Sequence, residues 1–220
     1  MSLRLGITMR VVENTGYPER RDALSREWVE YIDFVFPGAI LIPIVNKADS
    51  VEELIKDLNI GGIILSGGND WGETSDRDET ERIIVNYCKT INLPILGVCR
   101  GMQVLNILFG GTIAKNLTSL GKGEHAAKEH QVMVESSSFQ RLTDKEKIYV
   151  NSFHNHGILI DGLAQDLKIF AITKDGIVEG FVHNTLPILA TQWHPERKSP
   201  SAIFDQQLIS RLFTKGSFWD

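Results

Sequence analysis

Residues 94–103, Pro-Ile-Leu-Gly-Val-Cys-Arg-Gly-Met-Gln, carry the pattern that decides the fold. An apolar run typical of a buried strand leads into Gly-x-Cys-x-Gly, and apolar residues at helical spacing follow as far as Gly110-Gly111. This is the cysteine version of a nucleophile elbow, in which a reactive side chain sits on a sharp turn between a strand and a helix. Because the N-terminus of a helix favours a thiolate, the pattern indicates a nucleophilic Cys99. A buried structural cysteine is the alternative that this motif alone leaves open.

The segments around this elbow predict an α/β fold. Short apolar runs alternate with longer amphipathic ones through the first half of the chain, which is typical of a parallel sheet built from strand–helix–strand units. Asp78 is expected to cap the helix before Pro94, with Glu81 completing a capping box. We expect strands over 5–9, 39–45, 62–65 and 94–98, and helices over 22–36, 51–58 and 80–89.

After residue 147 the pattern changes to short runs of strand character. We expect strands over 148–152, 168–173, 178–183 and 188–192, a closing helix over 199–213, and a surface loop over the polar segment 115–130. Neither a repeat nor a linker divides the 220 residues, so the sequence predicts a single domain over residues 1–220.

Composition and charge exclude several classes of function. The formal net charge is −5, so no broad basic field attracts nucleic acid or an anionic membrane. No apolar run reaches the roughly 20 residues that a membrane-spanning helix needs, and the first residues lack the pattern of a signal peptide. The two cysteines do not form a CxxC pair, which fits a reducing compartment. We therefore expect a cytoplasmic protein that acts on a small molecule.

A second motif supplies the partners that a cysteine nucleophile needs. Residues 188–196, Ile-Leu-Ala-Thr-Gln-Trp-His-Pro-Glu, run from an apolar strand into a histidine, with a carboxylate two positions later. A thiol nucleophile needs a base, and the base needs a group that fixes its tautomer and orientation. His194 and Glu196 can supply both. A strand end with a solvent-facing His and Glu is the weaker reading once the elbow is considered.

A third motif is Ser66-Gly67-Gly68, which follows the apolar run 62–65. Glycines after a buried strand leave backbone N–H groups free to face a cleft. The N–H groups of Gly68 and Arg100 are therefore candidates for an oxyanion hole above the scissile carbonyl. A Gly-Gly turn is common after strands, so this motif supports the other two without proving them.

Together, these three motifs resemble the class I glutamine amidotransferase family, and their order agrees with that family from residue 5 to about 213. The resemblance implies a flavodoxin-like α/β fold with a mostly parallel central sheet flanked by helices. It also implies Cys99 as nucleophile, His194 as general base and acid, and Glu196 as the group that orients His194. No metal or organic cofactor is implied.

Within the family, the chain resembles the stand-alone γ-glutamyl hydrolase branch more than the amidotransferase subunits. The elbow continues to Gly110-Gly111-Thr112 as in that branch, and residues 150–154, Val-Asn-Ser-Phe-His, match its substrate-side strand. The branch usually carries His and Gln next, where this chain has Asn155 and His156. The implied reaction is hydrolysis of a γ-glutamyl amide through a cysteine thioester. The residues implied to lie near the substrate are Gln103, Ser152, Phe153 and His154.

Several alternatives stay open at this point. A γ-glutamyl amine, peptide or nucleotide amidate would present the same half to Cys99, and the oligomeric state is not determined. A glutaminase subunit that passes ammonia to a separate synthetase is the second hypothesis, and an inactive binding module on the same fold is the third. His154 and His156 invite a metal hypothesis, as do His125 and His130. No cysteine or regularly spaced carboxylate completes a ligand set, however, so no metal is expected.

Overall fold

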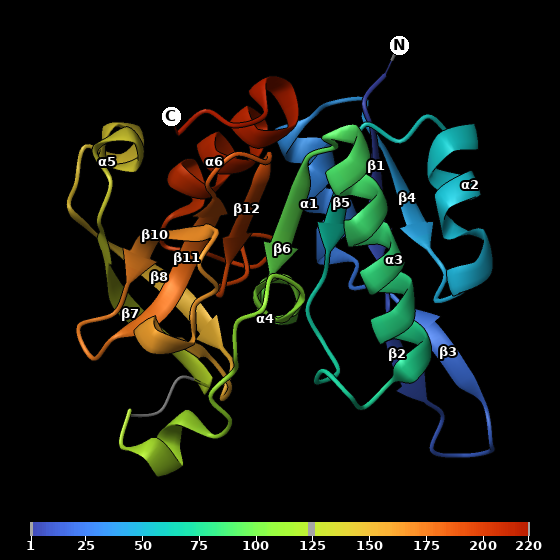
Figure 1. Ribbon diagram of the computed structural model, residues 1–220, viewed down its shortest axis with the longest axis horizontal. Helices are drawn as coiled ribbons and strands as arrows, with labels where there is room; N and C mark the ends of the chain where they lie inside the picture. Colours follow the sequence, from blue (N-terminus) through green and yellow to red (C-terminus); the bar gives the residue numbers. More distant parts are fainter. Residues whose placement is uncertain (1, 123–125, 220) are drawn as a thin grey trace.

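The computed structural model describes residues 2–122 and 126–219. In this part of the chain one large sheet is built from ten strands (Figure 1). These are β1 (Arg4–Thr8), β4 (Ile40–Ile44), β5 (Gly62–Leu65), β6 (Ile95–Val98), β7 (Ala126–Val134), β8 (Lys147–Phe153), β9 (Ile158–Leu159), β10 (Leu167–Ile172), β11 (Ile177–His183) and β12 (Ile188–Thr191). Their order is β4-β1-β5-β6-β12-β11-β10-β7-β8, with β9 paired to β11.

The sheet has a parallel part and an antiparallel part. Strands β4, β1, β5, β6 and β12 run parallel to one another, and the remaining pairs, including β12 with β11, are antiparallel. Every residue of β5, β6 and β12 is buried, as expected for parallel strands covered on both faces. The predicted α/β fold with a parallel core is therefore confirmed.

Helices cover both faces of the sheet (Figure 1). They are α1 (Glu27–Val35), α2 (Val51–Asp57), α3 (Ser75–Ile91), α4 (Arg100–Leu108), α5 (Ser137–Thr143) and α6 (Ala202–Lys215), with short 3₁₀ turns η1 (Ala48–Ser50), η2 (Leu117–Leu120) and η3 (Ile160–Gly162). Trp28 of α1 and Leu212 of α6 belong to one buried cluster. Ile84 of α3 and Leu105 of α4 belong to a second one. Within the described ranges, no helix combines the length and apolar composition that crossing a membrane requires.

The structure corrects the expected helix over 22–36 and the expected loop over 115–130. The helix begins at Glu27, because Arg20–Ala23 forms β3 and pairs with β2 (Arg10–Glu13) in a separate hairpin. The loop is wrong at its end, where Ala126–His130 belongs to β7 and pairs along β8. In both cases polar residues form strands through backbone pairing, which a search for apolar alternation does not detect. His125 lies outside the described residues.

The topology brings the three sequence motifs to one edge of the sheet. Parallel strands β5, β6 and β12 lie side by side, so their carboxyl ends point the same way. The register pairs Leu65, the last residue of β5, with Gly97 of β6. It also pairs Val98 with Thr191, which are the last residues of β6 and β12. Whatever follows each strand must meet its neighbours there, which is where open α/β sheets place their ligands.

Candidate active site

The elbow holds Cys99 in a strained conformation. Its φ is +54° and its ψ −106°, an unfavourable region for a residue with a Cβ, which costs of order 1–3 kcal/mol. The turn is fixed by the Cys99 N–H, which donates to the Thr191 carbonyl at 2.8 Å. Close packing explains the next glycine, since a Cβ on Gly101 would lie 2.0 Å from the Leu65 carbonyl oxygen. The glycine pattern of the motif therefore allows β5 to approach the start of α4.

Hydrogen bonds hold both the ring and the backbone of His194. Its Nδ1 lies 2.7 Å from Glu196 Oε1, and both side chains are buried. The His194 N–H donates to Asn151 Oδ1 at 2.9 Å, and Asn151 Nδ2 donates back to the His194 carbonyl at 2.8 Å. Because Nδ1 contacts Glu196, Nε2 is the ring nitrogen available to Cys99. Asn151 was not among the predicted site residues, although it lies in the quoted segment 150–154.

Gly67 lies against both His194 and Cys99. A Cβ at this position would lie 2.9 Å from His194 Cε1 and 3.6 Å from Cys99 Cβ. A side chain here would therefore enter the space that the imidazole and the thiol share. Gly68 follows with φ +104°, a conformation that favours glycine.

Cys99 and His194 shift each other's pKa. Burial alone would raise the pKa of the Cys99 thiol, but the charge and hydrogen bond of His194 hold it below its ordinary value, with a further contribution from His154. Burial would likewise lower the pKa of His194, but the Cys99 thiolate and the hydrogen bond to Glu196 raise it to about 9. The arrangement therefore favours a thiolate–imidazolium pair over a neutral thiol and imidazole. By contrast, burial raises the pKa of Cys88 to about 12, which keeps that thiol protonated.

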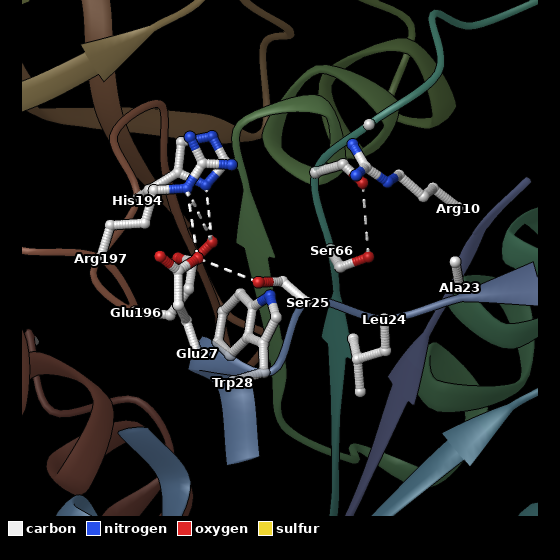
Figure 2. Close-up of a pocket in the computed structure, with 12 residues that line it drawn as sticks. Arg10, Ala23, Leu24, Ser25, Glu27, Trp28, Ser66, His194, Glu196 and Arg197 are labelled. Atoms are coloured by element: carbon white, nitrogen blue, oxygen red, sulfur yellow. Dashed lines mark hydrogen bonds and ion pairs between the residues drawn. The ribbon is translucent and has the colours of Figure 1, made fainter. Parts of the chain in front are cut away.

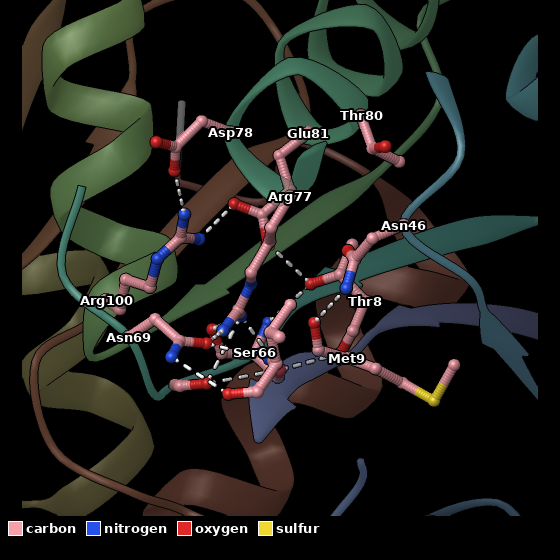
Figure 3. Close-up of polar contacts among 12 residues, drawn as sticks. Thr8, Met9, Asn46, Ser66, Asn69, Arg77, Asp78, Thr80, Glu81 and Arg100 are labelled. Atoms are coloured by element: carbon pink, nitrogen blue, oxygen red, sulfur yellow. Dashed lines mark hydrogen bonds and ion pairs between the residues drawn. The ribbon is translucent and has the colours of Figure 1, made fainter. Parts of the chain in front are cut away.

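A buried ion-pair network supports the Ser-Gly-Gly turn (Figure 3). Arg77 is fully buried and donates to the carbonyls of Ser66 at 2.8 Å and Gly67 at 3.2 Å. Its Nε lies 3.0 Å from Glu81 Oε1, which also accepts a hydrogen bond from Thr8 at 2.8 Å. The turn thus receives two of its hydrogen bonds from a guanidinium whose charge Glu81 balances.

The same network reaches the elbow. Arg100 pairs with the second oxygen of Glu81 and, at 2.5 Å, with Asp78 Oδ1. The capping box predicted for Asp78 and Glu81 is therefore wrong: α3 begins at Ser75, and both carboxylates turn inward to a pair of buried arginines. The S/T/D-x-x-E pattern fits a cap locally, and only the position of Arg100 in space shows the other use.

Three of the four predicted substrate residues, Gln103, Phe153 and His154, line one cavity of about 270 Å³. Gln103 is held there by two hydrogen bonds from Nε2, to the His156 carbonyl at 3.0 Å and to Gln192 Oε1 at 3.2 Å. The residues that line this cavity include Gly68, Cys99, Arg100, Gln103, Phe153 and His154. Ser152 is fully buried and is not among the lining residues.

A second cavity of about 250 Å³ is also lined by Gly68, together with His194 and Glu196 (Figure 2). Figure 2 shows Arg10 and Arg197 on opposite sides of it. Arg197 lies 3.8 Å from Glu27, and the Arg10 side chain packs against Gly68. Arg10, Glu27 and Arg197 were not predicted from the sequence, since they belong to none of the three motifs.

This geometry agrees with comparisons to known proteins. The Peptidase C26 family model matches residues 5–196. A glutamine amidotransferase-related protein of Schizosaccharomyces pombe is 36% identical over 172 residues, covering 68% of this chain and 65% of that protein. Gamma-glutamyl-CDP-amidate hydrolase of Campylobacter jejuni is 31% identical over 204 residues, covering 89% of this chain and 90% of that enzyme.

The chain belongs to the Peptidase C26 family and is a hydrolase of the class I glutamine amidotransferase type. A solved structure supports the fold: the glutaminase domain of Trypanosoma brucei CTPS with bound acivicin superimposes with a TM-score of 0.73 at 16% identity. That alignment covers 100% of this chain and 97% of the glutaminase domain.

Removing the shared carboxylate should weaken both the fold and the site. We expect Glu81→Ala to lower the free energy of unfolding by about 3–5 kcal/mol, because it leaves two buried guanidinium groups with incomplete partners. Urea unfolding followed by circular dichroism measures this. The matched control is Glu79→Ala on the exposed side of the same helix, where the carboxylate pairs with Arg82. Equal losses in the two variants would contradict the role of Glu81.

Proposed function

We propose that this protein hydrolyses a γ-glutamyl amide bond through a thioester on Cys99. The observation that carries the proposal is the strained Cys99, which lies beside His194 while Glu196 holds the Nδ1 of His194 at 2.7 Å. This is the arrangement of nucleophile, base and orienting group that acyl transfer requires. The family membership supports it independently.

In the first half-reaction the Cys99 thiolate attacks the γ-carbonyl carbon and a C–S bond forms. The N–H groups of Gly68 and Arg100 donate hydrogen bonds to the oxyanion that develops. The His194 imidazolium then donates its proton to the departing nitrogen as the C–N bond breaks. In the second half-reaction neutral His194 takes a proton from water, the water attacks the thioester, and glutamate leaves with the thiolate restored.

The two cavities suggest how the substrate lies. The cavity that contains Cys99, Gln103 and His154 takes the glutamyl half, because it holds the nucleophile and the residues that the family resemblance assigns to the substrate. The cavity beside His194 takes the leaving group, because His194 must reach the departing nitrogen. Gly68, which lines both, then lies next to the scissile bond.

For the leaving group we propose a nucleotide amidate, with γ-glutamyl-CDP-amidate as the specific substrate and glutamate and cytidine diphosphoramidate as products. Support comes from the Campylobacter jejuni relative and from the residue sequence of segment 68–74, Gly-Asn-Asp-Trp-Gly-Glu-Thr, which resembles that hydrolase. The guanidinium groups of Arg10 and Arg197 also line the cavity, and guanidinium groups bind phosphate oxygens well. We place this activity in capsule polysaccharide modification.

Glutamate release from a panel of γ-glutamyl compounds tests the proposal. The panel holds glutamine, a γ-glutamyl amine, a γ-glutamyl peptide and γ-glutamyl-CDP-amidate. We expect fast release from the amidate that is abolished in Cys99→Ala and nearly intact in Cys88→Ala, since the Cys88 thiol is buried and protonated. Equal losses from both substitutions would assign Cys99 a folding role. Slow glutamine turnover that rises only with an added synthetase would instead identify a glutaminase subunit.

The pH dependence tests the roles of His194 and Glu196. Activity needs a deprotonated Cys99 and a protonated His194, so it should rise through a thiol pKa below the ordinary value and fall as His194 loses its proton near pH 9. In Glu196→Gln one of the groups that raise the pKa of His194 is lost. We therefore expect the alkaline limb of kcat/KM to move to lower pH and kcat to fall. An unchanged profile would remove Glu196 from the site.

Arg10 tests the leaving-group cavity. Replacing it by glutamine should lower kcat/KM for γ-glutamyl-CDP-amidate by about tenfold or more, because a charge-assisted hydrogen bond to phosphate is lost, and should leave glutamine turnover little changed. Arg20→Gln in the same hairpin is the control, since Arg20 does not line this cavity. A similar loss with both substrates would show that Arg10 supports the Gly68 turn and does not recognise the phosphates.

A further inference from the structure

A buried carboxylate that the mechanism above does not use lies behind the first cavity. Glu179 of β11 is fully buried, and in the described part of the chain no Arg or Lys pairs with it. Its Oε1 lies 3.4 Å from Nε2 of His154 and 3.4 Å from Nε2 of His130. An isolated buried carboxylate is costly, so Glu179 needs a partner, and these imidazoles are the groups that contact it.

The contacts of the two ring nitrogens favour a doubly protonated His154. Its Nδ1 lies 3.0 Å from the His156 carbonyl oxygen, which can only accept, so Nδ1 carries a proton. Nε2 faces Glu179, and a lone pair there would oppose the carboxylate. With a proton on Nε2 as well, the ring is an imidazolium paired with a carboxylate. The charge of Glu179 correspondingly raises the pKa of His154 against the lowering effect of burial.

The remaining groups around His154 agree with a positive charge. Cys99 lines the same cavity, and its thiolate also raises the pKa of His154. The His130 ring meets the His154 ring edge to face, with centroids 6.3 Å apart. His156, the neighbour two positions on, lies 3.2 Å from Asp70 and is thereby supplied with its own carboxylate. Among the described residues, Glu179 is therefore the carboxylate that contacts His154.

We propose that Glu179 is a positioning residue that holds His154 as an imidazolium at the wall of the Cys99 cavity. The inference deepens the proposed function and rests on Cys99 as its nucleophile. The thiolate then lies in the field of two cations, one on His194 and one on His154. The two imidazolium groups act differently. His194 donates its proton to the leaving group, whereas His154 keeps its Nε2 proton because Glu179 stays ionised. The His154 charge therefore persists through the stage at which His194 is neutral.

The test follows the thiolate directly and needs no substrate. The rate of iodoacetamide labelling of Cys99 in the full chain is measured against pH, with Cys99→Ala as the blank. In Glu179→Gln, which keeps the shape and removes the charge, we expect the labelling midpoint to rise by about one pH unit. His154→Gln should give a similar rise. The double variant should show no more than either single one, because Glu179 acts through His154.

His130→Gln is the matched control, because His130 contacts the same carboxylate but is not among the residues that line the Cys99 cavity. Its midpoint should not rise. Unchanged midpoints in Glu179→Gln and His154→Gln, or shifts that add in the double variant, would overturn the proposal. If Glu179→Gln does not fold, as judged by circular dichroism, an unshifted His154→Gln overturns it alone.

Failure of this inference is distinguishable from failure of the proposed function. Glutamate release by the wild-type protein with unshifted midpoints would refute the role of Glu179 and leave the hydrolase intact. Shifted midpoints without release from any γ-glutamyl compound would support the role of Glu179 in setting the charge around Cys99 and refute the proposed reaction.

Discussion

Glu81 accepts hydrogen bonds from three parts of the chain: Thr8 at the end of β1, Arg77 on α3 and Arg100 at the start of α4. Pairing of the strands brings the Ser-Gly-Gly turn and the elbow to the same edge of the sheet, but it does not fix their rotation relative to each other. The two arginines do so, one by holding the carbonyls of the turn and the other by anchoring the helix that follows Cys99. Burying so many charges is costly, and complete pairing offsets that cost.

Backbone strain and electrostatics act together at Cys99. The positive φ places the thiol at the tip of the turn, and close contact between Gly101 and Leu65 keeps the helix where that conformation must persist. The thiol then meets charges from separate elements, His194 after β12 and His154 at the end of β8. A flexible turn would let the thiolate move away from these charges, so the strain also serves to keep the pKa of Cys99 low.

Sequence alone could predict the parallel core and the meeting of Cys99, His194 and Glu196, because buried strands are apolar runs and the motifs follow them directly. It could not predict the β2–β3 hairpin, whose polar residues pair through the backbone. Nor could it predict the use of Asp78 and Glu81, since a local pattern that fits a helix cap does not reveal an arginine about twenty positions away. Long-range partners such as Glu179 for His154 are decided by sheet order, which local periodicity does not contain.

Gly68 lines both cavities, which form the two lobes of the proposed ligand site: a glutamyl lobe at Cys99 and a leaving-group lobe at His194. An inhibitor confined to the glutamyl lobe would meet Cys99 and Gln103, which belong to a motif shared with other glutamine amidotransferases. A compound that extends past Gly68 into the leaving-group lobe would meet Arg10 of the β2–β3 hairpin, which lies outside the motifs. Chemical selectivity for this protein is therefore to be sought in the second lobe, with a reactive group directed at the thiol and a tail built for the hairpin.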